Sequence, residues 1–164
     1  MARMVLQVAV VGASSAGAAL EATAEEVGAA LASAGAVVVC GGLGGVMEAA
    51  CRGAKAAGGL TVGFLPGTDP SEANAWVDVV VPTGMGEARN ILVVRSAEVV
   101  VAVGGEYGTL SEIALALRAG IPVIGLGTWS LVRGDGQADA GIVTAADAPT
   151  AVSKALRLAG AARR

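Results

Sequence analysis

The sequence contains no histidine, only two cysteines, few aromatic residues and no internal cluster of basic residues. Without histidine the chain lacks the commonest general base and metal ligand, which excludes a Ser-His-Asp triad or a zinc site. Cys40 and Cys51 form no C-x-x-C pair, so we expect no metal site and interpret both as small buried apolar residues. The aromatic residues are too few for a large stacking surface: Phe64, Trp76, Tyr107 and Trp129.

The net charge is −3, and Arg163 and Arg164 are the only basic cluster. This charge pattern disfavours nucleic acid as a partner. Arg3 and the apolar residues after it resemble a secretion signal, but the same residues form the predicted first strand. The uncharged run 27–47 contains glycines that make a membrane span improbable. We therefore predict a cytoplasmic protein without a membrane partner.

Continuous apolar runs dominate the chain, and runs of this kind are typical of parallel strands that are covered on both faces. Predicted strands are Val5–Val11, Val37–Cys40, Leu60–Leu65, Val77–Val81, Val99–Val103 and Pro122–Leu126. Predicted helices are Ala16–Ala34, Val46–Ala57, Glu87–Ser96, Leu110–Ala119 and Asp147–Leu158. The alternation predicts an α/β fold, a Rossmann-like doubly wound parallel sheet in one domain over residues 1–164.

The most informative segment follows the strand Val99–Val103, where Gly104, Gly105 and Gly108 lead into a helix that begins near Thr109. Backbone N–H groups in the first turn of a helix lack intrahelical acceptors and attract anions, so this turn is a candidate phosphate site. Thr109 can cap the helix and offer a hydroxyl group to a phosphate. Thr109 and Glu112 also fit a T-x-x-E capping box, so Glu112 faces either the helix end or a ligand.

Two further glycine-rich turns follow earlier predicted strands. The turn after the second strand and the start of the next helix contain Gly41, Gly42, Gly44, Gly45, Met47 and Glu48. The turn after the first strand contains Gly12 and Ser14. Open α/β sheets bind ligands at the carboxyl edge of their strands, so all three turns are candidate contacts to one phosphorylated small molecule.

Charged residues lie at the same edge. Arg89 is expected in or near the first turn of a helix, where a cation opposes the helix dipole and therefore indicates a nearby anion. The alternative is an exposed Arg89 that pairs with Glu87 or another carboxylate. Glu48 either faces the ligand or pairs with Arg52 one helical turn later. Together with Glu112, these residues are candidates for an acid/base pair and a phosphate clamp.

Two loops stand out. Residues 66–74 are polar and turn-rich, and we expect them to overhang the ligand edge. Residues 128–141 form a longer segment, for which a lid and a mobile surface excursion are both open.

The segments Gly41–Met47, Arg89-Asn90 and Gly105–Glu112 resemble motifs of the Lonely Guy phosphoribohydrolases in the SLOG superfamily. The resemblance implies a Rossmann-like fold, a homodimer or homotetramer, and cofactor-independent cleavage of a nucleoside 5'-monophosphate into base and ribose 5-phosphate. It would make Arg89 and Glu112 catalytic, and it would place phosphate at Gly108 and Thr109.

The sequence departs from the hydrolase signature at four positions: Gly104 replaces proline, Glu106 and Glu48 replace glycines, and Asn90 replaces lysine. These departures resemble a sister branch that includes molybdenum cofactor carrier proteins, which bind a phosphorylated pterin without cleaving it. The retained Arg89 and Glu112 favour the hydrolase, which is the main prediction. The altered positions favour the alternative, a noncatalytic molybdenum cofactor carrier or nucleotide-binding protein.

Two other enzyme classes are disfavoured. Lysine decarboxylases need pyridoxal phosphate, and Lys55 and Lys154 occupy ordinary helical surface positions. Dinucleotide-dependent dehydrogenases place an acidic residue after the second strand, where this chain has Cys40 and Gly41.

Overall fold

The structure is a computed structural model that describes residues 5–162; Arg3, Arg163 and Arg164 lie outside this range. Strands and helices alternate along most of the chain, as the apolar pattern predicted. The strands are β1 Gln7–Gly12, β2 Val37–Cys40, β3 Thr61–Leu65, β4 Val79–Pro82, β5 Val99–Val103, β6 Val123–Leu126, β7 Leu131–Val132, β8 Ala138–Asp139 and β9 Ile142–Thr144. The helices are α1 Ala18–Ser33, α2 Val46–Ala56, α3 Asn90–Arg95, α4 Tyr107–Arg118 and α5 Ala148–Ala162, with 3-10 turns η1 Pro70–Glu72 and η2 Gly86–Arg89.

Seven of the strands form one parallel sheet in the order β4-β3-β2-β1-β5-β6-β9. The predicted Rossmann-like doubly wound architecture is thereby confirmed. β1 and β5 are neighbours at the centre, with Gly12 opposite Val103. Every residue of β5 is buried, which explains why its sequence is a continuous apolar run.

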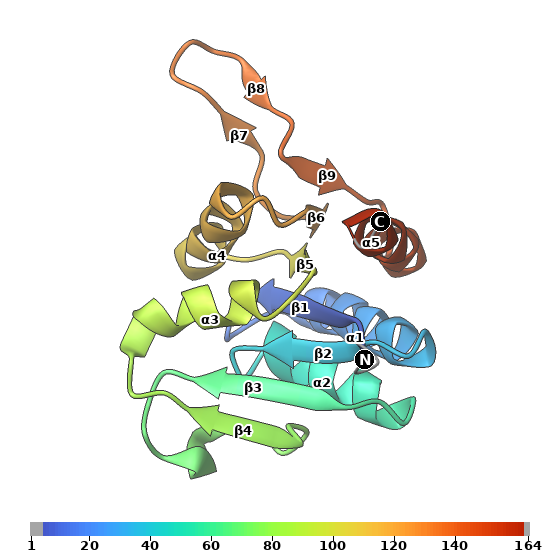
Figure 1. Cartoon of the computed structure of the whole chain (residues 1–164), viewed down its shortest axis with the longest axis vertical. Helices are drawn as coiled ribbons and strands as arrows, with labels where there is room; N and C mark the ends of the chain where they lie inside the picture. The colour runs from blue at the N-terminus through green and yellow to red at the C-terminus, as the bar shows by residue number, and fades with distance from the viewer. Residues whose placement is uncertain (1–4, 163–164) are drawn as a thin grey trace.

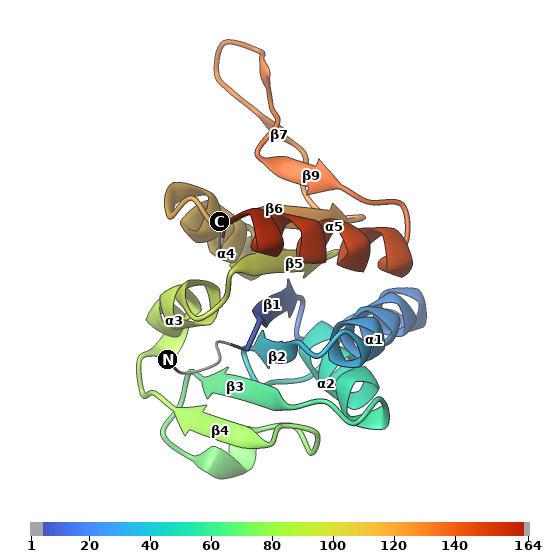
Figure 2. The same cartoon turned by 45° about the vertical axis from the view of Figure 1, so that its right-hand side comes forward.

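Helices cover both faces of the sheet, as Figures 1 and 2 show: α1, α2 and α5 lie on one side, α3 and α4 on the other. Successive residues of β1 contribute to opposite layers of the core. Val8 and Val10 pack with α1, α2 and α5, whereas Ala9 and Val11 pack with α3 and α4. The two layers bury both faces of the central strands, from whose ends the candidate site is built.

Helices α1 and α2 approach each other closely through a reciprocal pair of glycines. A Cβ atom at Gly28 of α1 would lie 1.9 Å from the carbonyl oxygen of Ala50, and one at Gly53 of α2 would lie 2.0 Å from the carbonyl oxygen of Glu25. The two helix backbones therefore touch directly. The Ala-rich composition thus produces close packing without large side chains.

The structure differs from the predicted elements mainly after β6. Residues 128–141 contain the short antiparallel hairpin β7–β8, which projects away from the body of the molecule (Figures 1 and 2). The hairpin is followed by β9, an edge strand that the sequence analysis did not predict. The helix predicted over Glu87–Ser96 begins as the 3-10 turn η2 and becomes α-helical only at Asn90. Within residues 5–162, no helix combines the length and the apolar character needed to cross a bilayer.

Candidate functional site

The candidate site lies where the chain reverses its direction of sheet assembly, between β1 and β5. From β1 the chain proceeds through β2 and β3 to the edge strand β4, and it then returns to place β5 on the other side of β1. The segment after β1 leads to α1 on one face, and the segment after β5 leads to α4 on the opposite face. Such a switch point leaves a crevice at the carboxyl ends of the strands.

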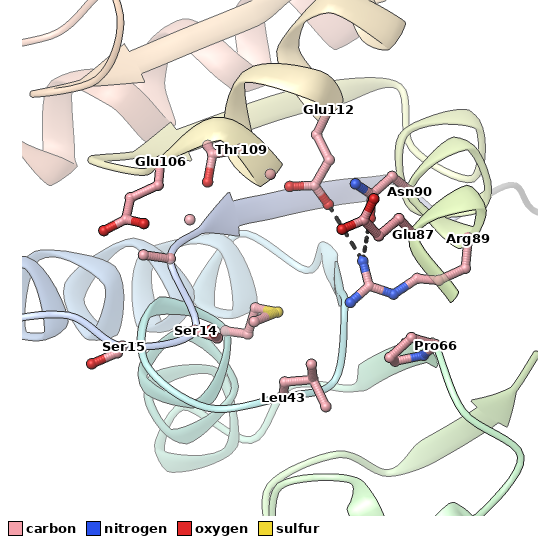
Figure 3. A pocket seen from close by; sticks show the side chains of 14 residues that line it. Ser14, Ser15, Leu43, Pro66, Glu87, Arg89, Asn90, Glu106, Thr109 and Glu112 are labelled. Atoms are coloured by element: carbon pink, nitrogen blue, oxygen red, sulfur yellow. Dashed lines mark hydrogen bonds and ion pairs between the residues drawn. The ribbon is translucent and has the colours of Figure 1, made fainter. Parts of the chain in front are cut away.

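A cavity of about 380 Å³ occupies this crevice. Its walls come from segments after β1, β2, β3 and β5, together with η2 and the starts of α2 and α4. The residues that line it are Gly12, Ala13, Ser14, Ser15, Leu43, Met47, Pro66, Glu87, Arg89, Asn90, Glu106, Gly108, Thr109 and Glu112. In Figure 3, Arg89, Asn90 and Glu112 cluster at one end, whereas Glu106 and Ser15 lie toward the other.

Helix α4 begins at Tyr107, two residues before the predicted cap, and Glu106 is its N-cap residue. Thr109 is therefore not the N-cap, and the predicted capping box with Glu112 is wrong. Thr109 is instead a buried residue of the first helical turn that lines the cavity. No side chain caps this helix end, so its first-turn N–H groups are potential anion donors, and Gly108 and Thr109 of this turn line the cavity.

The turn between β5 and α4 explains one departure from the hydrolase signature. Gly104 has a φ of +56°, whereas proline is fixed near −65°. The backbone of this turn therefore cannot accommodate the signature proline. Glu106, the second departure, lies next to the first turn of α4 and is exposed at the cavity wall.

Arg89 and Glu112 meet inside the cavity although they come from η2 and α4. Nη1 of Arg89 lies 4.0 Å from Oε1 of Glu112, and the residues are 8% and 6% exposed. Burial raises the pKa of Glu112 to about 7, and the nearby Arg89 charge opposes this rise. The alternative, an exposed Arg89 paired with Glu87 or another carboxylate, is wrong in its exposure and in Glu87, because Arg89 is buried and its carboxylate neighbour is Glu112. The site instead combines a buried guanidinium with a carboxyl group that titrates near neutrality.

The glycine turn after β2, residues 41–45, lies against Arg89 and is called the turn behind Arg89 below. Asn74 holds this turn, because its Nδ2 donates to the carbonyl oxygen of Leu43 at 2.8 Å and its backbone N–H donates to that of Gly42 at 2.9 Å. A Cβ atom at Gly41 would lie 2.8 Å from Nη2 of Arg89, so glycine leaves the space that the guanidinium occupies. The turn thus positions Leu43 and admits Arg89.

Glu48 does not line the cavity. Its predicted partner Arg52 donates instead to Glu25 of α1, with Nη2 at 2.8 Å from Oε2. The predicted pairing within α2 is therefore wrong, because the close contact of α1 with α2 offers Arg52 a carboxylate on the neighbouring helix.

The structure divides the predicted site residues into two groups. Seven line the cavity: Gly12, Ser14, Met47, Arg89, Gly108, Thr109 and Glu112. The others lie in the flanking turns or face elsewhere: Gly41, Gly42, Gly44, Gly45, Glu48, Gly104 and Gly105. The three predicted turns do converge on one place, but their glycines mostly shape the backbone instead of forming the wall.

Several wall residues were not among the predicted site residues. Pro66 is the first residue of the loop 66–74, which was expected to overhang the ligand edge, although Pro66 itself was not named as a site residue. Ser15 lies in the turn after β1, so the rule that ligands bind at strand ends could have identified it. Leu43 carries no such signal, because an apolar residue between glycines has no distinctive chemistry. Residues 131–139 of the projecting hairpin do not line the cavity, which argues against a lid in this conformation.

The two cysteines are buried, as predicted, and lie beside Met47. Their sulfur atoms are 3.5 Å apart, and the hydrogen bond between them lowers the pKa of Cys40 and raises that of Cys51. Within residues 5–162, no three side chains of His, Cys, Asp or Glu form a group that could hold a metal ion.

Solved structures similar to this chain include two proteins described by the cofactor that they bind. The molybdenum cofactor binding protein from Rippkaea orientalis shares 32% sequence identity, with 96% of this chain and 98% of that chain covered and a TM-score of 0.81. A Moco carrier protein from Chlamydomonas reinhardtii shares 34% identity, with 96% and 99% covered and a TM-score of 0.83. DNA processing protein A from Streptococcus pneumoniae, at 21% identity and a TM-score of 0.71 over 61% of its chain, shares the fold alone.

The sequence comparisons agree with the structural ones. An uncharacterised protein from Archaeoglobus fulgidus is 42% identical over 129 residues, which cover 79% of this chain and 85% of that protein. The model of the SLOG cluster4 family matches residues 5–154, which contain the sheet and every wall of the cavity. With its parallel sheet, switch-point cavity and nearly full-length match, the chain belongs to the SLOG cluster4 family.

Proposed function

We propose that the protein binds the molybdenum cofactor as a phosphorylated pterin and carries it without cleaving it. The observation that carries this proposal is the similarity to molybdenum cofactor binding and carrier proteins over 96% of the chain, at 32–34% identity. The findings therefore favour the alternative from the sequence analysis over the main prediction of a hydrolase.

The proposed ligand lies with its phosphate at the first turn of α4. Gly108 and Thr109 supply backbone donors there, and Gly12 and Ser14 of the turn after β1 line the same cavity. Gly104 and Gly105 shape this phosphate turn, while Gly41, Gly42, Gly44 and Gly45 shape the turn behind Arg89. A carrier needs such a grip but no bond cleavage, which is compatible with the altered signature at Glu106 and Asn90.

The apolar wall accommodates the planar part of the ligand. Leu43 and Met47 line the cavity beside Pro66, so a pterin ring has aliphatic and thioether surface to pack against. Glu48 lies outside this wall and has no direct role in the proposal. The predicted homodimer or homotetramer remains a prediction.

Phosphoribohydrolase activity is a second candidate, which the Arg89–Glu112 pair favours. A carboxyl group with a pKa of about 7 is suited to general acid/base chemistry at neutral pH, and Arg89 can orient the phosphorylated sugar. On this hypothesis Glu112 stabilises positive charge that develops on the ribose or guides the attacking water.

The carrier proposal is tested by cofactor loading. The protein is incubated without oxygen with cofactor released from a molybdenum enzyme and passed through a desalting column, after which bound molybdenum and pterin are measured. We expect equimolar molybdenum and pterin with the protein, and reduced retention in Thr109→Val, which removes the hydroxyl group from the cavity wall. Glu26→Gln on the exposed face of α1 is the control.

The hydrolase candidate is tested on the same preparations with a panel of nucleoside 5'-monophosphates. Base and ribose 5-phosphate released by the parent and not by Glu112→Gln would establish the hydrolase and overturn the carrier proposal. Cofactor retention without base release supports the carrier. Failure to retain cofactor at high protein concentration would contradict it.

A further inference from the structure

A chain of hydrogen bonds runs from Arg89 to the first turn of α4. Nη1 of Arg89 donates to Oδ1 of Asn90, and Nδ2 of Asn90 donates to Oγ of Ser111 at 3.0 Å. The Ser111 hydroxyl group in turn donates to the carbonyl oxygen of Gly108 at 2.9 Å. The chain therefore connects the buried guanidinium at one end of the cavity to Gly108, a wall residue of α4. Figure 3 shows its first link, from Arg89 to Asn90.

The direction of this chain fixes the orientation of the Asn90 amide. Because the Ser111 hydroxyl group uses its hydrogen on Gly108, it offers a lone pair to Asn90 and accepts from the amide nitrogen. The amide oxygen of Asn90 must then face Arg89. Ser111 thus acts on Arg89 through Asn90, without touching the guanidinium.

Asn90 holds Arg89 without neutralising it. An amide oxygen accepts a hydrogen bond but carries no net charge, and Asn90 is itself buried. The nearest carboxylate oxygen, on Glu112, lies 4.0 Å from Nη1, which is ion-pair distance but outside hydrogen-bond distance, so Glu112 compensates the charge of Arg89 only in part. Nε of Arg89 is buried and has no hydrogen-bond partner in the described part of the chain. A buried cation in this state is costly unless an anion completes it.

We propose that Asn90 and Ser111 are positioning residues that hold the incompletely compensated charge of Arg89 for a second anionic group of the ligand, separate from the phosphate at the first turn of α4. This inference rests on the proposed function, because it concerns the same cavity, and it narrows the ligand class to elongated molecules with two anionic groups. The amide at position 90, where the hydrolase signature has lysine, is then a specificity feature of this chain.

The positioning role is tested first without any ligand. In ¹⁵N NMR spectra, a guanidinium held by a buried acceptor gives separate Nη signals, whereas a freely rotating one gives an averaged signal. We expect separate signals for Arg89 in the parent, averaged signals in Ser111→Ala and separate signals again in Ser111→Thr, which restores the hydroxyl group. Ser111 is exposed, so both variants are expected to fold. Separate signals in Ser111→Ala would overturn the positioning role.

The second anion is tested by titrating inorganic phosphate into the protein. Backbone amide signals of Gly108 and Thr109 report the phosphate of the proposed function, and the Arg89 guanidinium signals report the second anion. We expect two binding curves in the parent. Asn90→Asp gives Arg89 a carboxylate of the same shape. The variant should therefore weaken phosphate binding at Arg89 at least tenfold.

The outcomes separate the two proposals. If the Gly108 and Thr109 signals shift to saturation while the Arg89 signals stay still, the inference fails and the proposed phosphate site survives. If neither set shifts, the proposed function fails together with the inference. Unchanged phosphate binding at Arg89 in Asn90→Asp would also overturn the inference.

Discussion

Glu112 and Arg89 face each other across 4.0 Å inside the cavity, and each is less than a tenth exposed. They belong to α4 and η2, which are brought together only when the sheet has formed on both sides of β1. Burial raises the pKa of Glu112 to about 7, so its carboxyl group is partly protonated at neutral pH. The pair therefore links stability to pH.

The stability of the protein should depend on pH through Glu112. Its pKa rises from the ordinary value of 4.5 to about 7 on folding. Between these values the folded state keeps a proton that the unfolded chain has lost, so stability falls as pH rises through this interval. At about 1.4 kcal/mol per pKa unit, the loss is ~3 kcal/mol above pH 7. Glu112→Gln should remove this dependence.

Urea unfolding at pH 5 and pH 8 measures the effect as a difference between parent and variant, which cancels the contributions of other groups. The free energy of unfolding of Glu112→Gln should exceed that of the parent by more at pH 8 than at pH 5. Glu26→Gln, on the exposed face of α1, should show no such change. An equal difference in unfolding free energy at the two pH values would mean that the pKa of Glu112 is not raised on folding.

Glu106 should weaken phosphate binding at the start of α4. Its exposed carboxylate lies on the wall that holds Gly108 and Thr109. Removing one unit charge near an anion in solvent changes the affinity by a few-fold, and salt screens the effect. We therefore expect Glu106→Gln to raise phosphate affinity about threefold at low salt in calorimetric titrations, and less at high salt. An equal gain in Glu26→Gln would assign the effect to net charge instead.

Asn74 should stabilise both the fold and the turn behind Arg89. In Asn74→Asp, a carboxylate oxygen replaces the donor to the Leu43 carbonyl, which leaves two acceptors facing each other. The expected cost is about 1–3 kcal/mol in urea unfolding, the range for a lost buried hydrogen bond. The same amide-to-acid change at Gln137, on the exposed hairpin, should cost less than about 0.5 kcal/mol.

Gly28 should be intolerant of even one added carbon. The Cβ atom of Gly28→Ala would lie 1.9 Å from a backbone oxygen of α2, and no side-chain rotation can relieve that contact. We expect Gly28→Ala to lower the free energy of unfolding by more than about 3 kcal/mol, which exceeds the usual cost of overpacking a core. Gly160→Ala in α5 has open space around the new carbon and should stabilise the protein by about 0.5–1 kcal/mol, as alanine does in helices. Thermal unfolding compares the two.

The sheet and its ligand edge were predictable because they follow from local patterns. Val99–Val103 was predicted with its observed bounds, because five consecutive apolar residues are typical of a strand that is buried on both faces, as this one is. The end of β3 and the glycine turns located the crevice in the same way. The start of α4 was missed because threonine and glutamate at this spacing fit a cap, and only the tertiary turn at Gly104 moves the helix start to Tyr107.

Contacts between segments that lie far apart in the chain could not be predicted from the sequence. Arg52 pairs with Glu25 because α1 and α2 touch through their glycines, and no local spacing reveals that contact. β9 was missed because three moderately apolar residues at an edge have a weak pattern. The burial of Arg89 likewise depends on the space left by Gly41.

The scarcity of aromatic residues gives the protein two optical probes beside turns that border the cavity. The indole of Trp129 donates to the carbonyl oxygen of Glu106 at the start of α4, at 3.2 Å. The backbone of Trp76 is bound to Asn74, the residue that holds the turn behind Arg89. Because the chain contains no other tryptophan, replacing either one by phenylalanine leaves the intrinsic fluorescence of the other to follow events at a single turn.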